Sequence, residues 1–160
     1  MQNIIIFGGS GLVGHQVKNL FLNNEYRVIN IDIKGDKTKH QNLIFIKYDL
    51  SLIESVEDLY NLVKDYLPNC RALINCSLLP YPEFNIRKLS KANLLDACSS
   101  LFALDFFISS LAVNYAQEEF PKISLSVILI SSVKATFPPK FRHYNNINGM
   151  SSSPFYGSMK

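Results

Sequence analysis

Short apolar runs alternate along the chain with longer segments in which apolar residues recur every three or four positions. Five of the runs have the length of strands, and they cover residues 3–7, 26–33, 43–48, 72–76 and 124–130. The longer segments predict three helices, over residues 12–21, 56–67 and 90–119. Because short buried strands that alternate with helices join through right-handed crossovers, the pattern favours a parallel sheet.

The fold class that we predict is α/β, with one domain over residues 1–160. We expect a Rossmann-type, doubly wound parallel sheet of five strands in the order 3-2-1-4-5, with helices on both faces. Ser51 and Glu54 have the spacing of a capping box and predict the start of the second helix. Residues 134–153 are rich in Pro, Asn and Ser, which predicts a long surface loop, and loops of this length are often functional.

The composition of the chain mainly excludes classes of partner. A chain of 160 residues that is 48% apolar is long enough to bury a core, and its net charge of +3 comes from scattered basic residues, so we expect no nucleic-acid partner. The apolar segment 94–116 contains Asp96 and Asp105, which predicts a buried helix and no membrane partner. With no signal-peptide pattern at its start, the protein is expected to be cytoplasmic.

The cysteines also point to the cytoplasm. Their number is odd and their spacing does not match that of metal ligands, so we expect reduced thiols and no metal site; they are Cys70, Cys76 and Cys98.

A glycine-rich segment directly after the first predicted strand is the clearest candidate for ligand binding. Four of the seven glycines in the chain fall in it, and it consists of Gly8, Gly9, Ser10, Gly11, Leu12, Val13 and Gly14. Glycines at these positions allow a sharp turn and a close approach of backbone N–H groups to a pyrophosphate, which the following helix N-terminus attracts. No Gly-Lys-Ser/Thr follows, so a P-loop is not indicated. The alternative is a glycine turn without a ligand.

Asp32 ends the second predicted strand, 18 residues after Gly14. An acid near this offset accepts hydrogen bonds from the adenosine ribose and repels a 2′-phosphate. The glycine segment contains no Arg or Lys, so the sequence favours NAD over NADP as cofactor, although Lys34 and Lys37 lie nearby. The alternative is a solvated aspartate at a strand end.

Tyr156 and Lys160 are four residues apart at the start of a possible last helix. On one helix face, the ammonium group would lower the pKa of the tyrosine from about 10 toward the value that a general acid/base needs. The pair gains weight from Ser131 and Ser132 at the end of the fifth predicted strand, because active sites of such sheets gather there. A Tyr-x-x-x-Lys pattern also occurs by chance.

Together these residues resemble the short-chain dehydrogenase/reductase superfamily over essentially the whole chain. The resemblance rests on the glycine segment, Asp32, Asp49-Leu50, Asn75-Cys76-Ser77, Ile130-Ser131-Ser132, Tyr156 and Lys160. It implies an NAD-dependent oxidoreductase that moves hydride between an alcohol or ketone and the nicotinamide. By this resemblance, Tyr156 of this chain would be the catalytic acid/base and Lys160 would bind the nicotinamide ribose. Ser132 would orient the substrate oxygen.

The resemblance also assigns the cofactor contacts. Asp32 and Ile33 would lie at the adenosine ribose, and Asp49 would contact the adenine amino group with Leu50 beside it. Cys76 and Ser77 match the small residues that pass under the cofactor. The complete protein is expected to form a homodimer, as family members often do.

The glycine spacing and the 24 residues from Ser132 to Tyr156 resemble the extended branch that handles sugar nucleotides. The substrate is then a small molecule, expected to be a sugar or a nucleotide-sugar. The loop from Ala135 to Met150 is similar to that of members in surface-glycan biosynthesis.

The sequence departs from the family in three ways. Phe7 replaces a threonine, and no asparagine of the proton relay is found between Phe102 and Phe107, where Asp105 is the polar residue. The sequence stops at Lys160, before the last two strands of the family fold, so we expect the amino-terminal part of a longer enzyme or a truncated product with weak turnover. A dinucleotide-binding sensor or scaffold without turnover is the alternative, and a Rossmann-like domain that binds no nucleotide is a third.

Overall fold

The computed structural model describes residues 1–78, 90–118 and 124–131. The predicted loop at 134–153 therefore lies outside the described residues, as do Ser132, Tyr156 and Lys160.

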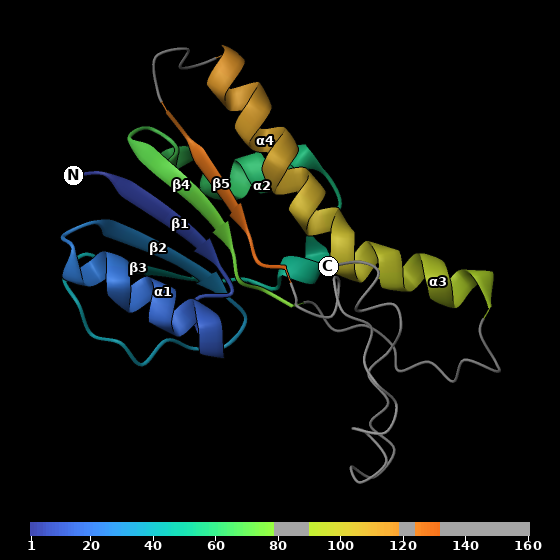
Figure 1. Cartoon of the computed structure of the whole chain (residues 1–160), viewed down its shortest axis with the longest axis horizontal. Helices are drawn as coiled ribbons and strands as arrows, with labels where there is room; N and C mark the ends of the chain where they lie inside the picture. Colours follow the sequence, from blue (N-terminus) through green and yellow to red (C-terminus); the bar gives the residue numbers. More distant parts are fainter. Residues whose placement is uncertain (79–89, 119–123, 132–160) are drawn as a thin grey trace, which may run out of the picture.

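A five-stranded parallel sheet forms the centre of the molecule (Figure 1). Its strands are β1 (Asn3–Phe7), β2 (Arg27–Asp32), β3 (Leu43–Lys47), β4 (Cys70–Asn75) and β5 (Ser126–Leu129). They are arranged in the order β3-β2-β1-β4-β5, and every neighbouring pair is parallel. The predicted α/β class and strand order are confirmed.

Helices cover both faces of this sheet. They are α1 (Leu12–Asn23), α2 (Val56–Val63), α3 (Lys91–Cys98) and α4 (Leu104–Glu118). Along β1, Ile4 and Ile6 pack on the α1 side with Leu22, while Ile5 and Phe7 belong to the core under α2 and α4. Successive residues of a strand point to opposite faces, which is why an uninterrupted apolar strand becomes buried on both sides.

The helix α1 buries only part of the apolar stripe that predicted it, in which Val17 and Phe21 pack against the core. Leu12 is 88% exposed and Leu20 is 60% exposed, whereas the buried positions are Gly14, Lys18 and Leu22. These three are spaced by four residues and share one helix face. A lysine thus occupies the centre of the face that packs on the sheet.

The second helix begins at Val56, as its apolar pattern predicted, but the predicted capping residue is wrong. Ser51 lies in a 3₁₀ turn (Leu50–Leu52) and donates its N–H to Asp49, and the cap of α2 is Ser55, whose Oγ accepts the Asp58 N–H at 3.1 Å. Both serines precede an acidic residue by three positions, and only the path of the chain after β3 decides between them.

The third predicted helix begins where expected and runs without a gap to Glu118, but it is not α-helical throughout. Ser90 caps α3 in a reciprocal capping box with Asn93. A π-helical turn (Ser99–Ala103) then separates α3 from α4. No helix among the described residues is both long and apolar enough to cross a membrane.

Candidate functional site

A cleft of about 590 Å³ opens at the edge of the sheet where all five strands end. Each strand contributes a residue that follows its carboxyl end, and these are Gly8, Ile33, Asp49, Cys76 and Ile130. Parallel strands end on one edge, so five segments that are distant in sequence meet there. Ligands of open α/β sheets bind at this kind of crevice.

The glycine segment lies close against the loop that follows β4. Gly8 has a φ of +81°, and a Cβ built on it would lie 2.6 Å from the backbone N and Cα of Ser77. A Cβ on Gly14 would collide with the carbonyl oxygen of Gly8 and lie 2.7 Å from the Cα of Gly9. The glycine segment therefore packs directly on the loop after β4, and the first turn of α1 packs directly on the glycine segment, at distances that only glycine allows.

The amino-terminal end of α1 opens onto the cleft without a protein cap. Gly11 is the N-cap residue, no side chain caps the helix, and the first turn contains no acidic residue. Gly11, Leu12 and Val13 line the cleft. The free N–H groups and the helix dipole favour an anion at this point, and the residues present fit a pyrophosphate.

Asp32 lies beside the glycine segment and on the same side of the sheet. Its Oδ2 accepts the Ser10 N–H at 2.9 Å and its Oδ1 accepts the Lys34 N–H at 2.8 Å. The residue is 7% exposed and lines the cleft, so it is not a solvated strand-end aspartate. Each carboxylate oxygen keeps a second lone pair for a ligand hydroxyl.

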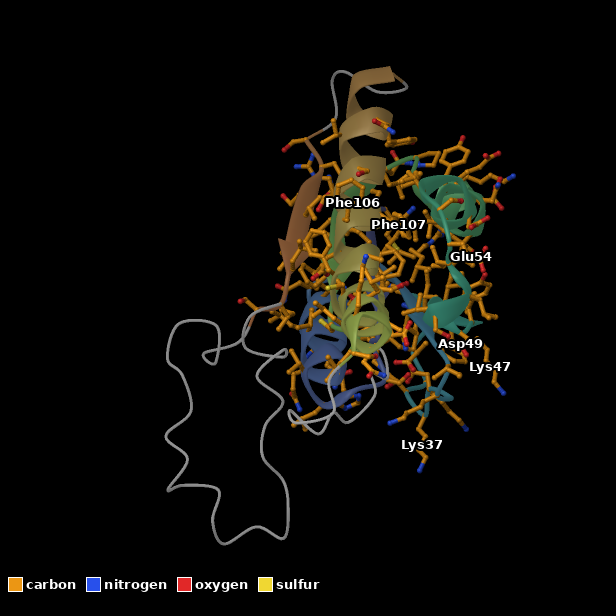
Figure 2. The ribbon with its side chains drawn as sticks, turned by 90° about the vertical axis from the view of Figure 1, so that its right-hand side faces the viewer. Lys37, Lys47, Asp49, Glu54, Phe106 and Phe107 are labelled. Atoms are coloured by element: carbon orange, nitrogen blue, oxygen red, sulfur yellow. The ribbon has the colours of Figure 1, made fainter. Side chains whose placement is uncertain are left out.

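The segments after β2 and β3 provide an apolar wall. Ile33 is 53% exposed and Leu50 is 5% exposed, and both line the cleft. Asp49 beside them accepts hydrogen bonds from the Oγ and N–H of Ser51 at 2.7 and 3.0 Å, which lower its pKa. Figure 2 shows Asp49 next to Lys47 on this side, with Lys37 extending outward. A flat base would find both an apolar surface and a carboxylate here.

The side-chain amide of Asn75 holds the segment that follows β4 in place. The N–H and Oγ of Ser77 donate to Asn75 Oδ1 at 3.0 and 2.6 Å, and Asn75 Nδ2 donates to Asp105 Oδ1 at 2.5 Å. Asp105 of α4 thus supports the segment after β4 through Asn75. It is not among the residues that line the cleft. Burial raises the pKa of Cys76, which keeps this thiol neutral beside the cleft.

Ten of the predicted cofactor-binding residues line the cleft: Gly8, Gly11, Leu12, Val13, Asp32, Ile33, Asp49, Leu50, Cys76 and Ser77. The other three, Gly9, Ser10 and Gly14, are not among the lining residues. Four further residues, which were not predicted to bind the cofactor, also line it: Lys34, Ser51, Leu78 and Ile130. Each of them is adjacent in the sequence to a residue that the sequence analysis had singled out, and this adjacency could have identified them.

No protein-family model matches the sequence, and a search of curated proteins finds no match. Solved structures do match. A short-chain dehydrogenase from Leptospira borgpetersenii with bound NAD+ superposes with a TM-score of 0.77 at 17% identity over 99% of this chain and 59% of its own. The chain has the fold of a short-chain dehydrogenase.

Two further structures of this fold are similar to the chain. A short-chain dehydrogenase family protein from Francisella tularensis gives a TM-score of 0.69 at 21% identity, over 100% of this chain and 58% of its own. ElxO with NADP bound gives 0.71 at 20% identity, over 99% and 62%. The chain therefore spans about 60% of the length of these structures. Their cofactors include both NAD+ and NADP.

In the described segments, no group of three or more His, Cys, Asp or Glu side chains could hold a metal ion.

Proposed function

We propose that this chain binds NAD in the cleft and supplies the cofactor-binding part of an NAD-dependent oxidoreductase. One observation carries the proposal: the uncapped amino-terminal end of α1 and the buried carboxylate of Asp32 face the same cleft. The helix end favours a diphosphate, and the carboxylate accepts hydrogen bonds from ribose hydroxyls. A dinucleotide presents a diphosphate and a ribose side by side.

NAD is proposed in preference to NADP because of the donors around Asp32. A 2′-phosphate would lie beside the carboxylate and be repelled by it. The nearest backbone donors, the N–H groups of Ser10 and Lys34, both point at Asp32 and are not available to a phosphate.

The reaction that we propose is hydride transfer between an alcohol and a ketone. The bound nicotinamide supplies the hydride acceptor or donor. By the resemblance, Tyr156 exchanges the proton, Lys160 lowers the pKa of Tyr156, and Ser132 orients the substrate oxygen. The spacing of Ser132 and Tyr156 supports an extended-type enzyme that acts on a sugar or nucleotide-sugar.

The second candidate is a dinucleotide-binding sensor or scaffold without turnover, or an inactive fragment. It rests on the same cleft, since the residues that line it account for cofactor binding, while Ser132, Tyr156 and Lys160 lie outside the described residues. Tyr156→Phe separates the two candidates in the full chain. In an enzyme it removes NAD reduction with a secondary alcohol and leaves NAD affinity unchanged; in a sensor, wild type and variant are equally inert.

Calorimetric titration with NAD tests the binding itself, and Gly11 offers a matched pair of variants. Gly11 has a φ of −75°, and a Cβ there would lie 3.4 Å from the Gly8 carbonyl oxygen, an ordinary contact distance, so alanine fits. We expect Gly11→Ala to bind NAD within about threefold of wild type, whereas Gly11→Asp places a like charge at the anion site and abolishes the heat of binding. Equal binding by both variants, or none by wild type, contradicts the proposal.

We also propose a cytoplasmic homodimer. The three free cysteines suit a reducing compartment. On the helical segment that ends in α4, Phe102, Phe106 and Val113 are 53–55% exposed, and Figure 2 marks Phe106 beside Phe107 there. A second copy would cover this stripe, and analytical ultracentrifugation distinguishes a dimer from a monomer.

A further inference from the structure

Lys18 is buried completely on the face of α1 that packs against the sheet. Its Nζ lies 2.6 Å from Asp36 Oδ2, and the two side chains are 1% and 3% exposed. A buried ion pair costs so much desolvation that an apolar pair of similar size is often at least as stable. Stability alone is therefore a weak reason for this pair, and its position suggests another.

Asp36 belongs to the post-β2 segment (residues 33–38), which leads away from the ribose acceptor Asp32. Its Oδ1 accepts the Thr38 N–H at 2.9 Å, and its Oδ2 accepts both Lys18 Nζ and Asn30 Nδ2 at 2.6 Å. Burial raises the pKa of this carboxyl, but hydrogen bonds, first of all that from Lys18, lower it more. The pKa lies below the ordinary 3.8, so the carboxylate is charged at neutral pH.

Asn30 connects this ion pair to the glycine segment. It is fully buried in the middle of β2, and the same Nδ2 that binds Asp36 also donates to Ser10 Oγ at 3.1 Å. Ser10 Oγ donates in turn to the Lys34 carbonyl at 3.2 Å. Ser10 is also the residue whose N–H binds Asp32. A continuous path of polar contacts thus runs from Lys18 to the carboxylate in the cleft.

We propose that Lys18 and Asp36 are positioning residues for the ribose end of the cleft, whose ion pair holds the post-β2 segment against the glycine segment and so fixes the carboxylate of Asp32. This inference rests on the proposed NAD binding. Neither residue lines the cleft, and both act through Asn30 and Ser10. Releasing the segment frees the N–H donors of Ser10 and Lys34 and lets Asp32 move, which weakens NAD binding and lessens the discrimination against a 2′-phosphate.

Three variants separate positioning from packing: Lys18→Met, Asp36→Asn and the double variant. Each single variant leaves a buried partner without its counter-charge and is expected to lower Tm, and the double variant is expected to regain much of that loss. The affinity for NAD is not expected to recover in the double variant, because none of the three variants restores the ion pair that holds the post-β2 segment. We expect the double variant to bind NAD about tenfold more weakly and NADP unchanged, by calorimetry on the full chain.

Lys39→Met is the matched control, since it removes an exposed lysine one residue beyond the segment and takes no part in the network or in the lining of the cleft. We expect a wild-type Tm and a wild-type ratio of NAD to NADP affinity. A double variant with wild-type Tm, NAD affinity and ratio overturns the inference and leaves the proposed function intact. Absence of NAD binding by wild type overturns both.

Ser10→Ala keeps the test independent of whether the double variant folds. It removes the hydroxyl that joins Asn30 to the Lys34 carbonyl and keeps the Ser10 N–H that binds Asp32. Ser10 is only partly buried, so we expect a Tm close to wild type. The ratio of NAD to NADP affinity is expected to fall severalfold, and an unchanged ratio contradicts the proposed path.

Discussion

Gly14→Ala is expected to abolish NAD binding and to lower the free energy of unfolding by about 3 kcal/mol, the upper range for forced overpacking. The added Cβ would collide with the Gly8 carbonyl oxygen and lie 2.7 Å from the Cα of Gly9. These are backbone atoms, so no side chain can move aside. The helix must shift away from the loop, and its N-terminus then no longer faces the diphosphate. Urea unfolding and calorimetry measure the two effects.

Gly35→Ala is the control for this substitution. A Cβ at Gly35 meets nothing within 4 Å, so the change is expected to alter stability by no more than about 0.5 kcal/mol and to leave NAD affinity unchanged. If Gly14→Ala behaves like Gly35→Ala, the close packing of loop and helix is not what forms the site.

Asp32→Asn is expected to weaken NAD binding about 30-fold, the equivalent of about 2 kcal/mol for a hydrogen-bonded charge. The amide keeps the size of the carboxylate but loses its charge and one acceptor, which the ribose hydroxyls need. NADP no longer meets a like charge, so its affinity is expected to stay the same or rise. Calorimetric titration of wild type and variant with both cofactors gives the ratio.

Asp65→Asn controls for the loss of one negative charge. Asp65 is exposed on the turn after α2 and does not line the cleft, so its removal is expected to change neither affinity. A parallel loss of NAD and NADP binding in Asp32→Asn would mean that the residue only holds the loop together. That outcome would remove the ribose contact from the proposal.

The sheet was predictable because its signals are local. The strand β1 is apolar at four of its five positions, and a run of this kind followed by an amphipathic segment has few ways to bury itself other than in a parallel sheet covered by helices. The first and last residues of each strand were harder to predict than the presence of the strand. The strand β4 begins at Cys70, two residues before the predicted start, because Cys70 pairs with Asn3 of β1, whose N–H donates to the Asn69 carbonyl.

The alternative helix start at Ser51 shows where local signals compete. Ser51 and Ser55 each have an acidic residue three positions later, and either could begin a helix. The structure resolves the choice because Asp49 and Ser51 form the short turn that carries Leu50 into the core. Tertiary burial of one leucine outweighs the capping preference at Ser51.

The amino-acid sequence by itself determined the class of fold and the candidate diphosphate site, since alternating strand and helix patterns, glycine spacing and an acid at a strand end are short-range patterns with a direct physical meaning. The tertiary structure decided which groups surround that acid. Lys18 looked like any helix lysine, and its burial depends on Asp36, 18 residues away along the chain. Side-chain pairs between a helix and a loop arise from the packing of both on one sheet, which no local pattern encodes.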